Sequence, residues 1–471
     1  GTLARPRGAG AQGPDELPRF LIVVAAAGGA SIIDGPLAIR HGESPNFQTI
    51  NAFPDAEVVS IPDSPFRAVD LQRGNAGAIP FPFRATQSGF VRKHKDDMLV
   101  VTHTGTSVNH SIAQKRSLTG NNAWNGRTLQ EAVALQFGQG LALPNVNMAG
   151  QGYLEPGTDN SLPPWAFAEP VANPDLWSLS LHGSRGVRGA PDADLVAMAR
   201  KVRDEKLDAE SAFAEAFRLS PALKRWRAQR EQTAPMLEGL DLVTRLNILP
   251  DQPPQLPLSD FGLTSGPDAD KVRAAFPRFL QDPMEAQAAL AFLLLKNRVS
   301  VTVTLGPSFN VLLDGQRIVN PPLAYDFSHQ AHRPAQAIMW DRLLGLTDRL
   351  IDLLKAEPLD EGAGVSFWDR SLLYVATEFG RSRRRQEAQD DFGSGHDLNN
   401  GSLLLSPMLK GNTVLGGVDP ATGLTYGFDP QTGAPDPGRT MSEPHVFAGV
   451  LQAMGIETPA GLPDMRAMRR G

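Results

Sequence analysis

The order of apolar and polar positions along the chain predicts strands that alternate with helices. Short apolar runs, several of them rich in β-branched residues, are typical of buried strands. These runs lie at 20–27, 97–102, 299–305, 371–377 and 402–405. Helical spacing of apolar residues occurs at 127–135, 283–296, 335–354 and from Ser442 onward. This alternation predicts an α/β fold with a doubly wound, mostly parallel sheet.

The middle of the chain departs from this pattern. Residues 150–190 are rich in Pro, Gly and Trp and predict long surface loops, whereas 192–247 have helical spacing. A Pro-rich segment follows at 251–258. We therefore expect a helical insertion at about 192–250, packed on the rim of the sheet over or beside the site, where it would act as a lid. The apolar stripe that should be covered consists of Leu195, Met198, Phe213 and Phe217.

The N-terminal end predicts a flexible arm and an exported protein. Residues 1–18 are rich in Gly, Pro and Arg and predict a loose arm that could contact a protein partner, followed by one domain over 19–471. The apolar stretch at 20–30 is too short to span a bilayer, so we expect no transmembrane segment. The chain begins at Gly1 and not at Met, which suggests a signal peptide that is already missing and a periplasmic or otherwise exported protein.

Composition narrows the chemistry. The chain has 471 residues, 41% of them hydrophobic and 20% charged, which is ordinary for a globular protein. The formal net charge is −6 and the basic residues are dispersed, so we expect no nucleic-acid partner. The one dense basic run, 381–385, lies next to acidic residues and favours a solvated loop. Because there is no cysteine, any metal must be bound through His, Asp, Glu, hydroxyl or backbone oxygen.

Potential metal ligands follow several of the predicted strands. Since the carboxyl ends of parallel strands meet at one edge of a sheet, we expect these side chains to converge. They are Asp34, Asp326 with His329 and His332, Glu378, and His396 with Asp397. Two cations held there could clamp a phosphate or sulfate ester and activate a nucleophile. Carboxylate and imidazole ligands suit zinc or manganese, and more oxygen-rich ligation suits magnesium or calcium.

Each of these residues also has a structural interpretation. Asp34 precedes Gly35 in a typical turn dipeptide. His329 and His332 could share one helix face and cap it or shield an aromatic side chain. Glu378 could form an ion pair with Arg381, which is otherwise our candidate for substrate binding. The two interpretations stay open for each residue.

The loop after the second predicted strand offers a nucleophile. It contains Ser107 among other hydroxyl residues, with His103 and His110 nearby. A hydroxyl there could attack a phosphoryl or sulfuryl centre if a metal lowered its pKa. We therefore take Ser107 and His110 as the catalytic candidates. The alternative is that the loop uses Ser, Thr and Asn for local hydrogen bonds.

At these positions the chain resembles the domain-of-unknown-function 1501 family, which is bacterial, usually exported and related to sulfatases and alkaline phosphatases. The similarity covers nearly the whole chain in the family's order. The matching stretches are Gly28–Asp34, Gly105–His110, Leu118–Gly120, Asp326–His329, Glu378–Arg383, Gly395–His396 and Lys410–Gly417. The stretch Glu-Phe-Gly-Arg from Glu378 is fairly specific in this context.

The resemblance implies an alkaline-phosphatase-like α/β fold, export, and a divalent-metal hydrolase acting on a small-molecule or glycan ester. Three positions depart from the family pattern. Ile32 stands where the family has His, Gly395 stands where it has Asp, and the spacing from Asp326 to His329 is longer by one residue. Lost carboxylates remove charge that would neutralise a cation. The alternative function is therefore a catalytically silent envelope scaffold or complex subunit with the same fold.

Overall fold

A single mixed sheet of eight strands forms the centre of the protein. The computed structural model describes residues 17–72, 84–181, 188–250, 258–306, 312–313, 316–317, 324–385 and 392–470. In sheet order the strands are β17 (Thr413–Leu415), β5 (Met98–Thr104), β16 (Asn399–Leu405), β13 (Ser371–Thr377), β1 (Phe20–Ala26), β8 (Thr302–Leu305), β6 (Asn145–Asn147) and β7 (Glu169–Pro170). All run parallel except β16, which is antiparallel to both β5 and β13.

β1 lies in the middle of this sheet, as its sequence predicts. It pairs in parallel with β13 on one side and with β8 on the other, so the three strands expected to be neighbours are neighbours. Every residue of β1 and β13 is buried. A strand that is buried on both faces has a continuous run of apolar residues. This run explains why the sequence predicted the bounds of β1 and β13 so closely.

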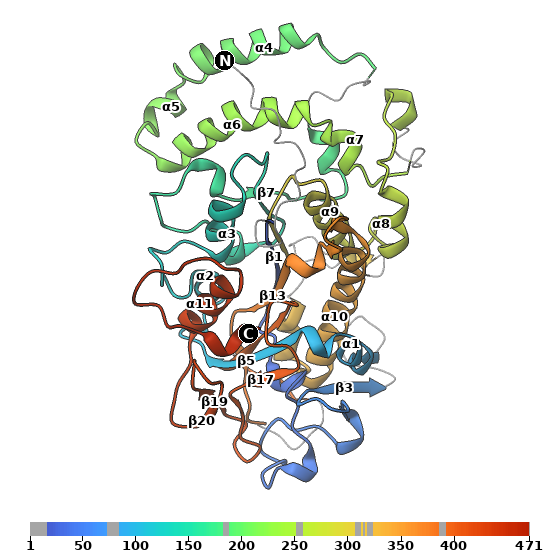
Figure 1. Cartoon of the computed structure of the whole chain (residues 1–471), viewed down its shortest axis with the longest axis vertical. Helices are drawn as coiled ribbons and strands as arrows, with labels where there is room; N and C mark the ends of the chain where they lie inside the picture. Colours follow the sequence, from blue (N-terminus) through green and yellow to red (C-terminus); the bar gives the residue numbers. More distant parts are fainter. Residues whose placement is uncertain are drawn as a thin grey trace.

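Helices cover both faces of the sheet (Figure 1). One layer contains α2 (His110–Thr119), α3 (Leu129–Phe137) and α11 (Glu443–Ala453). The other contains α9 (Pro283–Lys296) and α10 (His332–Ala356), with α1 (Gln87–His94) and α8 (Ala269–Ala275) packed on α10. Local signals define several helix starts. α3 begins with a capping box between Thr128 and Glu131, and α9 begins at Pro283 behind the cap of Asp282.

Short strands extend the loops of the central sheet. They are β2 (Val58–Ser60), β3 (Arg67–Gln72), β4 (Arg84–Thr86), β9 (Leu312–Leu313), β10 (Gln316–Arg317), β11 (Pro358–Asp360), β12 (Val365–Ser366), β14 (Gly380–Arg381), β15 (His396–Asp397), β18 (Gly417–Val418), β19 (Thr425–Phe428) and β20 (Pro435–Asp436). The antiparallel pair β14–β15 matters most for the site, because it sets Arg381 opposite His396.

The middle of the chain forms helices, but not the covered layer that the pattern predicts. These helices are α4 (Ala193–Val202), α5 (Ala212–Ala216), α6 (Pro221–Gly239) and α7 (Leu242–Leu246). They lie beyond the β7 edge of the sheet, on the rim (Figure 1). The expectation that their apolar stripe is covered is wrong, since Leu195, Met198, Phe213 and Phe217 are all exposed. The stripe partly packs on itself, with the rings of Phe213 and Phe217 4.8 Å apart.

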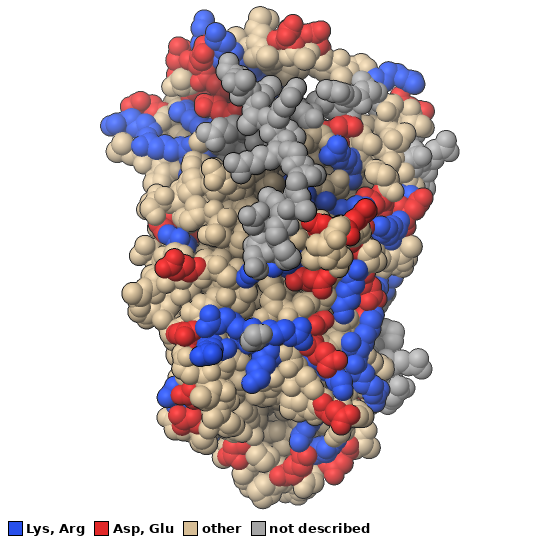
Figure 2. Space-filling model, in the orientation of Figure 1, with Lys and Arg blue, Asp and Glu red and all other residues tan. Residues whose placement is uncertain are grey.

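Several expectations concern parts of the chain at or beyond the described residues. Residues 1–16 of the expected arm and 251–257 of the Pro-rich segment lie outside them. Leu17 is buried, and its carbonyl accepts a hydrogen bond from Arg370 at 2.8 Å. Of the helices described, none has the length and apolarity needed to cross a bilayer. On the face shown in Figure 2, basic side chains lie beside acidic ones over much of the surface.

Candidate functional site

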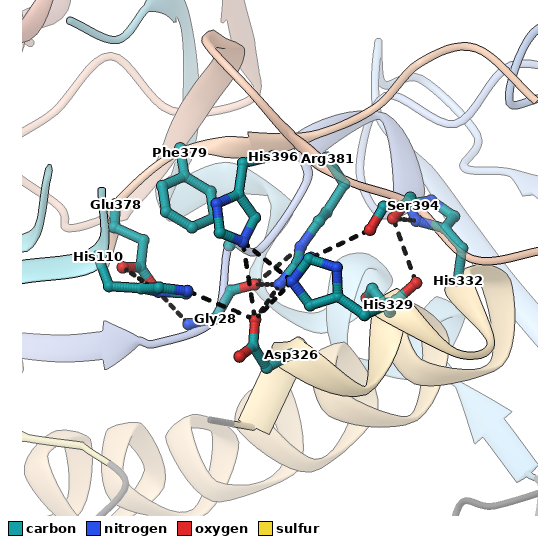
Figure 3. Close-up of polar contacts among 12 residues, drawn as sticks. Gly28, His110, Asp326, His329, His332, Glu378, Phe379, Arg381, Ser394 and His396 are labelled. Atoms are coloured by element: carbon teal, nitrogen blue, oxygen red, sulfur yellow. Dashed lines mark hydrogen bonds and ion pairs between the residues drawn. The ribbon is translucent and has the colours of Figure 1, made fainter. Parts of the chain in front are cut away.

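Six of the predicted site residues meet at the carboxyl edge of the sheet. Their elements are β13, after which Glu378 follows directly, α2, the 3₁₀ helix η11 (Ala324–His329), and the β14–β15 pair. The six residues are His110, Asp326, His329, Glu378, Arg381 and His396 (Figure 3). We call them the edge cluster.

Three members of the edge cluster could hold a metal ion. Nε2 of His110 lies 3.7 Å from Oδ1 of Asp326, and Nε2 of His396 lies 4.0 Å from the same oxygen. The ligand atoms of the three residues all lie within 4.8 Å of one another, and all three residues are partly buried. Two imidazoles and one carboxylate are the protein ligands of one class of catalytic zinc site.

Hydrogen bonds behind the cluster orient both imidazoles. Nδ1 of His110 donates to Oε2 of Glu378 at 2.9 Å, which directs Nε2 towards Asp326. Nδ1 of His396 donates to the carbonyl of Val108 at 2.9 Å, which leaves its Nε2 facing the same space. Metal-binding histidines are usually oriented in this way by a carboxylate or a backbone carbonyl. The arrangement therefore fits the chemistry of a metal site beyond the three ligand atoms.

Glu378 is fixed in turn by two further donors. The backbone N–H of Gly28 donates to Oε1, and the side-chain amide of Gln114 donates to Oε2 at 3.0 Å. The carboxylate is buried, and among the described residues His110 is the one member of the edge cluster to which it is hydrogen-bonded. Glu378 was expected to be a metal ligand, but in this geometry it supports a ligand. Among the described residues no hydrogen bond or ion pair joins Glu378 directly to Arg381, although both contact Gly28 and the charge of Glu378 raises the pKa of Arg381.

Two glycines allow the loop after β1 to pack closely against η11 and Phe379. Gly28 and Gly29 follow β1 with φ angles of +95° and +83°, in the region that favours glycine. A Cβ on Gly28 would lie 2.5 Å from the backbone nitrogen of Asp326. A Cβ on Gly29 would lie 2.6 Å from the ring of Phe379. The glycine pair of the sequence motif thus lets β1, η11 and the segment after β13 meet without a gap.

Arg381 is buried, and so is Arg385, which makes the expectation of a solvated basic loop wrong at both ends of the 381–385 run. The guanidinium of Arg381 donates to the carbonyl of Gly28 and, at 2.5 Å, to Oδ1 of Asp326. Another nitrogen lies 3.2 Å from Nε2 of His329 and 3.4 Å from the carbonyl of Ser394. Burial lowers the pKa of Arg381, and Asp326 opposes this effect. Most of its donors are engaged within the protein, so its present role is to hold Asp326.

The histidines of the cluster differ in proton affinity. Burial lowers the pKa of His110, but the hydrogen bond and the negative charge of Glu378 outweigh it, so the net shift is upward. Burial lowers the pKa of His396 to about 4, with help from the positive charge of Arg381. Burial and Arg381 also lower the pKa of His329. Nε2 of His329 and Nε2 of His396 lie 3.0 Å apart, a contact that is a hydrogen bond only if one of the two nitrogens carries a proton.

Phe379 supplies an apolar wall. Its ring stacks on His396 with centroids 4.1 Å apart and an angle of 24°. It also meets the edge of His110, at 5.0 Å. An apolar ring against two ligand-type imidazoles limits water access and restricts the rotation of both.

Asp34 does not join the edge cluster. Both Asp34 and His332 are buried, and Oδ1 of Asp34 lies 3.0 Å from Nε2 of His332. Nδ2 of Asn51 lies 2.6 Å from the same oxygen, and Nδ1 of His332 lies 2.7 Å from Oγ of Ser394. We call Asp34, Asn51, His332 and Ser394 the buried cluster. The two clusters adjoin through Ser394, whose carbonyl faces Arg381 (Figure 3).

None of the described hydrogen bonds joins Ser107 to the edge cluster. Its hydroxyl accepts a hydrogen bond from the backbone of Asn109 at 3.1 Å, which is the local pattern that the alternative interpretation predicts. Its neighbour Val108 contacts His396 through its carbonyl. Asp397 likewise accepts from the backbone of Asn399 and turns the chain locally.

Sequence reasoning missed several residues that complete the site. Gln114 lies four residues after His110 on α2, and this spacing places both on one helix face, so it could have been found. Asn51 and Ser394 have no such signal, because their partners are distant in sequence. No protein-family model matches this chain, and searches of curated proteins and of solved structures found no similar protein.

Proposed function

We propose that this protein is a metal-dependent hydrolase of phosphate or sulfate esters. The observation that supports it is the group His110, Asp326 and His396, whose ligand atoms lie within 4.8 Å of one another at the edge of the sheet. The donor set suits zinc or manganese better than magnesium or calcium, which prefer more oxygen ligands. A divalent ion there would polarise an ester oxygen as a Lewis acid.

The protein's own residues would orient the reaction. His329 has an imidazole with a lowered pKa, and its Nε2 lies 3.4 Å from Oδ1 of Asp326. A neutral imidazole beside the ligands could accept the proton of an attacking water or hydroxyl once its Nε2 is released from Arg381 and His396. Arg381 keeps Asp326 in position, and its nitrogen near His329 remains our candidate for contact with an ester oxygen. Ser107 remains the candidate nucleophile, and it would need to turn from Asn109 towards the cluster.

The motif resemblance supports the same proposal from another side. It would make the central sheet alkaline-phosphatase-like, the helices α4–α7 an insertion, and the protein an exported member of the domain-of-unknown-function 1501 family. It would also provide the substrate class, a phosphate or sulfate ester. The departures at Ile32 and Gly395 concern positions where that family has a histidine and a carboxylate. They are compatible with a site for one cation and weigh against two.

A second function has its own support. The guanidinium of Arg381 lies 2.5 Å from Oδ1 of Asp326, so a buried positive charge already neutralises the only carboxylate among the three ligand candidates. An ion pair in that place would serve a catalytically silent scaffold or complex subunit. This candidate predicts no tight metal and no turnover.

Metal content and turnover together test the proposal. The purified protein would be analysed for metals, then supplied in turn with zinc, manganese, magnesium and calcium and assayed with p-nitrophenyl phosphate and p-nitrophenyl sulfate. We expect one bound ion per chain, hydrolysis of one ester class, and loss of both in Asp326→Asn. Asp352→Asn, at an exposed carboxylate that pairs with Lys93, is the matched control and should change neither. Metal-free protein without turnover under every condition would favour the scaffold.

A further inference from the structure

A cleft of about 830 Å³ opens at the carboxyl ends of β6 and β7. Its walls come from the loop after β6 at 147–154, the loop after β7 at 170–175, and the segment 279–286 that leads into α9. Its size lies within the roughly 300–1,000 Å³ of typical small-molecule sites. Because β6 and β7 run parallel to β1 and β13, the cleft opens on the same sheet edge as the edge cluster.

A chain of amide side chains joins this cleft to the edge cluster. Gln151 lines the cleft, and its Oε1 accepts a hydrogen bond from Nε2 of Gln114 at 2.9 Å. The same Nε2 donates to Glu378 at 3.0 Å, and Glu378 holds His110. Gln114 is fully buried, and it also accepts from the backbone of Gly152 at 2.8 Å. The side-chain amide of Gln114 therefore lies between Gln151 in the wall of the cleft and the carboxylate of Glu378.

The lining of the cleft is uncharged for the most part. Among the described residues that line it there is no Lys or Arg, and the single acid is Asp175. Burial raises the pKa of this carboxyl. The polar lining consists of amides, and Asn173 and Gln281 are exposed to solvent. The apolar lining includes Leu154 and Leu280, which are exposed by 37% and 45%, respectively.

This lining selects one chemical class. Amides pair with hydroxyl groups as both donors and acceptors. Apolar side chains and the ring of Pro170 can pack against the C–H face of a sugar ring. Without a basic side chain, the cleft has no partner for a second phosphate or sulfate. A purely apolar ligand that covered Asn173 and Gln281 would separate their amides from water without offering a hydrogen bond, which is costly.

We infer that this cleft binds the neutral, hydroxyl-rich part of the substrate, a glycan unit whose ester group reaches the edge cluster. The position of the ester rests on the proposed function, whereas affinity for a neutral glycan is a property of the cleft alone. An experiment can therefore reject the position of the ester and the affinity for a neutral glycan independently of each other.

Binding of neutral saccharides to the intact protein tests the inference. Cellotetraose, maltotetraose and chitotetraose would be titrated by calorimetry and by saturation-transfer NMR, with p-nitrophenol as an aromatic, non-saccharide probe. Ala172→Trp places a large side chain at an exposed position of the cleft wall. Leu219→Trp, at an exposed position outside the cleft, is the matched control. Zinc affinity would be measured in all three proteins.

We expect at least one tetrasaccharide to bind, Ala172→Trp to weaken it at least about tenfold, and Leu219→Trp to leave it within about twofold. The double variant Asn173→Ala/Gln281→Ala should also weaken it, because the removed amides would bind hydroxyl groups. The inference is overturned if no saccharide binds, if only p-nitrophenol binds, or if Ala172→Trp has no effect. Saccharide binding by a protein that binds no zinc would retain the cleft and reject the hydrolase. Zinc binding and turnover without saccharide binding would retain the hydrolase and reject the cleft as a saccharide site.

Discussion

The edge cluster and the buried cluster pair the same two side-chain types in different surroundings. In the edge cluster Asp326 faces His110, His329 and His396, and all four side chains are partly open, with His329 exposed by 45%. In the buried cluster Asp34 faces His332, and both side chains are fully buried. His329 and His332 are only three residues apart in sequence, on either side of the junction between η11 and α10.

The difference lies in what completes each cluster. Nδ2 of Asn51 contacts both Asp34 and His332, and Ser394 contacts the other ring nitrogen of His332. The buried cluster therefore ties the loop after β1 to α10 and to the 392–397 segment, while Oδ2 of Asp34 has no hydrogen-bond partner among the described residues. In the edge cluster Nε2 of His110 faces Asp326 at 3.7 Å, and Nε2 of His396 and of His329 contact each other at 3.0 Å, all in a partly open space. Acid and imidazole pairs at a sheet edge therefore become binding candidates only where solvent can reach them.

Replacing each histidine by alanine should separate the two clusters most strongly. His332→Ala leaves Asp34 buried without its imidazole partner, and removing one partner of a buried pair costs about 3–5 kcal/mol. His329→Ala acts on a side chain exposed by 45% and should cost less than about 1 kcal/mol. Free energies of unfolding from denaturant titration would measure both. Equal losses in the two variants would mean that burial does not distinguish the clusters.

Glu378→Gln should weaken metal binding with a smaller effect on the fold. Gln has one acceptor oxygen where the carboxylate serves both Gly28 and His110, so His110 loses part of its orientation. Outer-shell changes of this kind typically cost about 10–100-fold in metal affinity. Zinc titration with a competing chelator would measure the change.

Glu443→Gln is the control for this substitution. Glu443 is also buried and accepts from the backbone and hydroxyl of Thr106, and no described hydrogen bond or ion pair joins it to the three ligand candidates. Its variant should keep the zinc affinity of the unmodified protein. If both variants lose affinity alike, the loss reflects general loosening of the fold and not the support of His110.

The sequence predicted the strands that carry the edge cluster, because a run of apolar residues can be recognised without knowing its contacts to distant parts of the chain. The run at 371–377 coincides with β13, so the position of Glu378 at the strand end followed directly. It could not predict that Arg381 is buried, because its partners Gly28 and Asp326 lie 353 and 55 residues away. A run of basic residues favours solvent until distant groups neutralise it.

The same limit explains the error at Asp34. Its position after β1 correctly placed it near the carboxyl edge, yet the side chain joins Asn51 and His332, which lie 17 and 298 residues away. Periodicity indicates which residues are buried in a strand, but it does not indicate which polar groups neutralise one another across loops. The apolar stripe of α4 and α5 shows the converse, because helical spacing predicted the helices and not what would cover them.

The smallest expected effect is the pH dependence that comes from protonation of His110. Its pKa in the folded protein is raised above 6.5, since Glu378 outweighs burial. The stabilisation that this provides to the metal-free protein is therefore fully present below the unfolded value and is lost as the pH rises through the folded value. Zinc requires the neutral ring, so zinc affinity should rise over the same pH interval. His396, with a pKa of about 4, is already neutral there and adds no step.

Glu378→Gln should move the His110 titration to lower pH, because burial and the positive charge of Arg381 would then be opposed only by the weaker charge of Asp326. NMR titration of the ring signals in metal-free protein would measure the midpoint, and Glu443→Gln should leave it unchanged. The midpoint of zinc affinity against pH should follow the NMR midpoint in both variants, since one proton and one ion compete for the same nitrogen. A His110 midpoint below 6.5 in the unmodified protein would show that burial, and not Glu378, governs this side of the edge cluster.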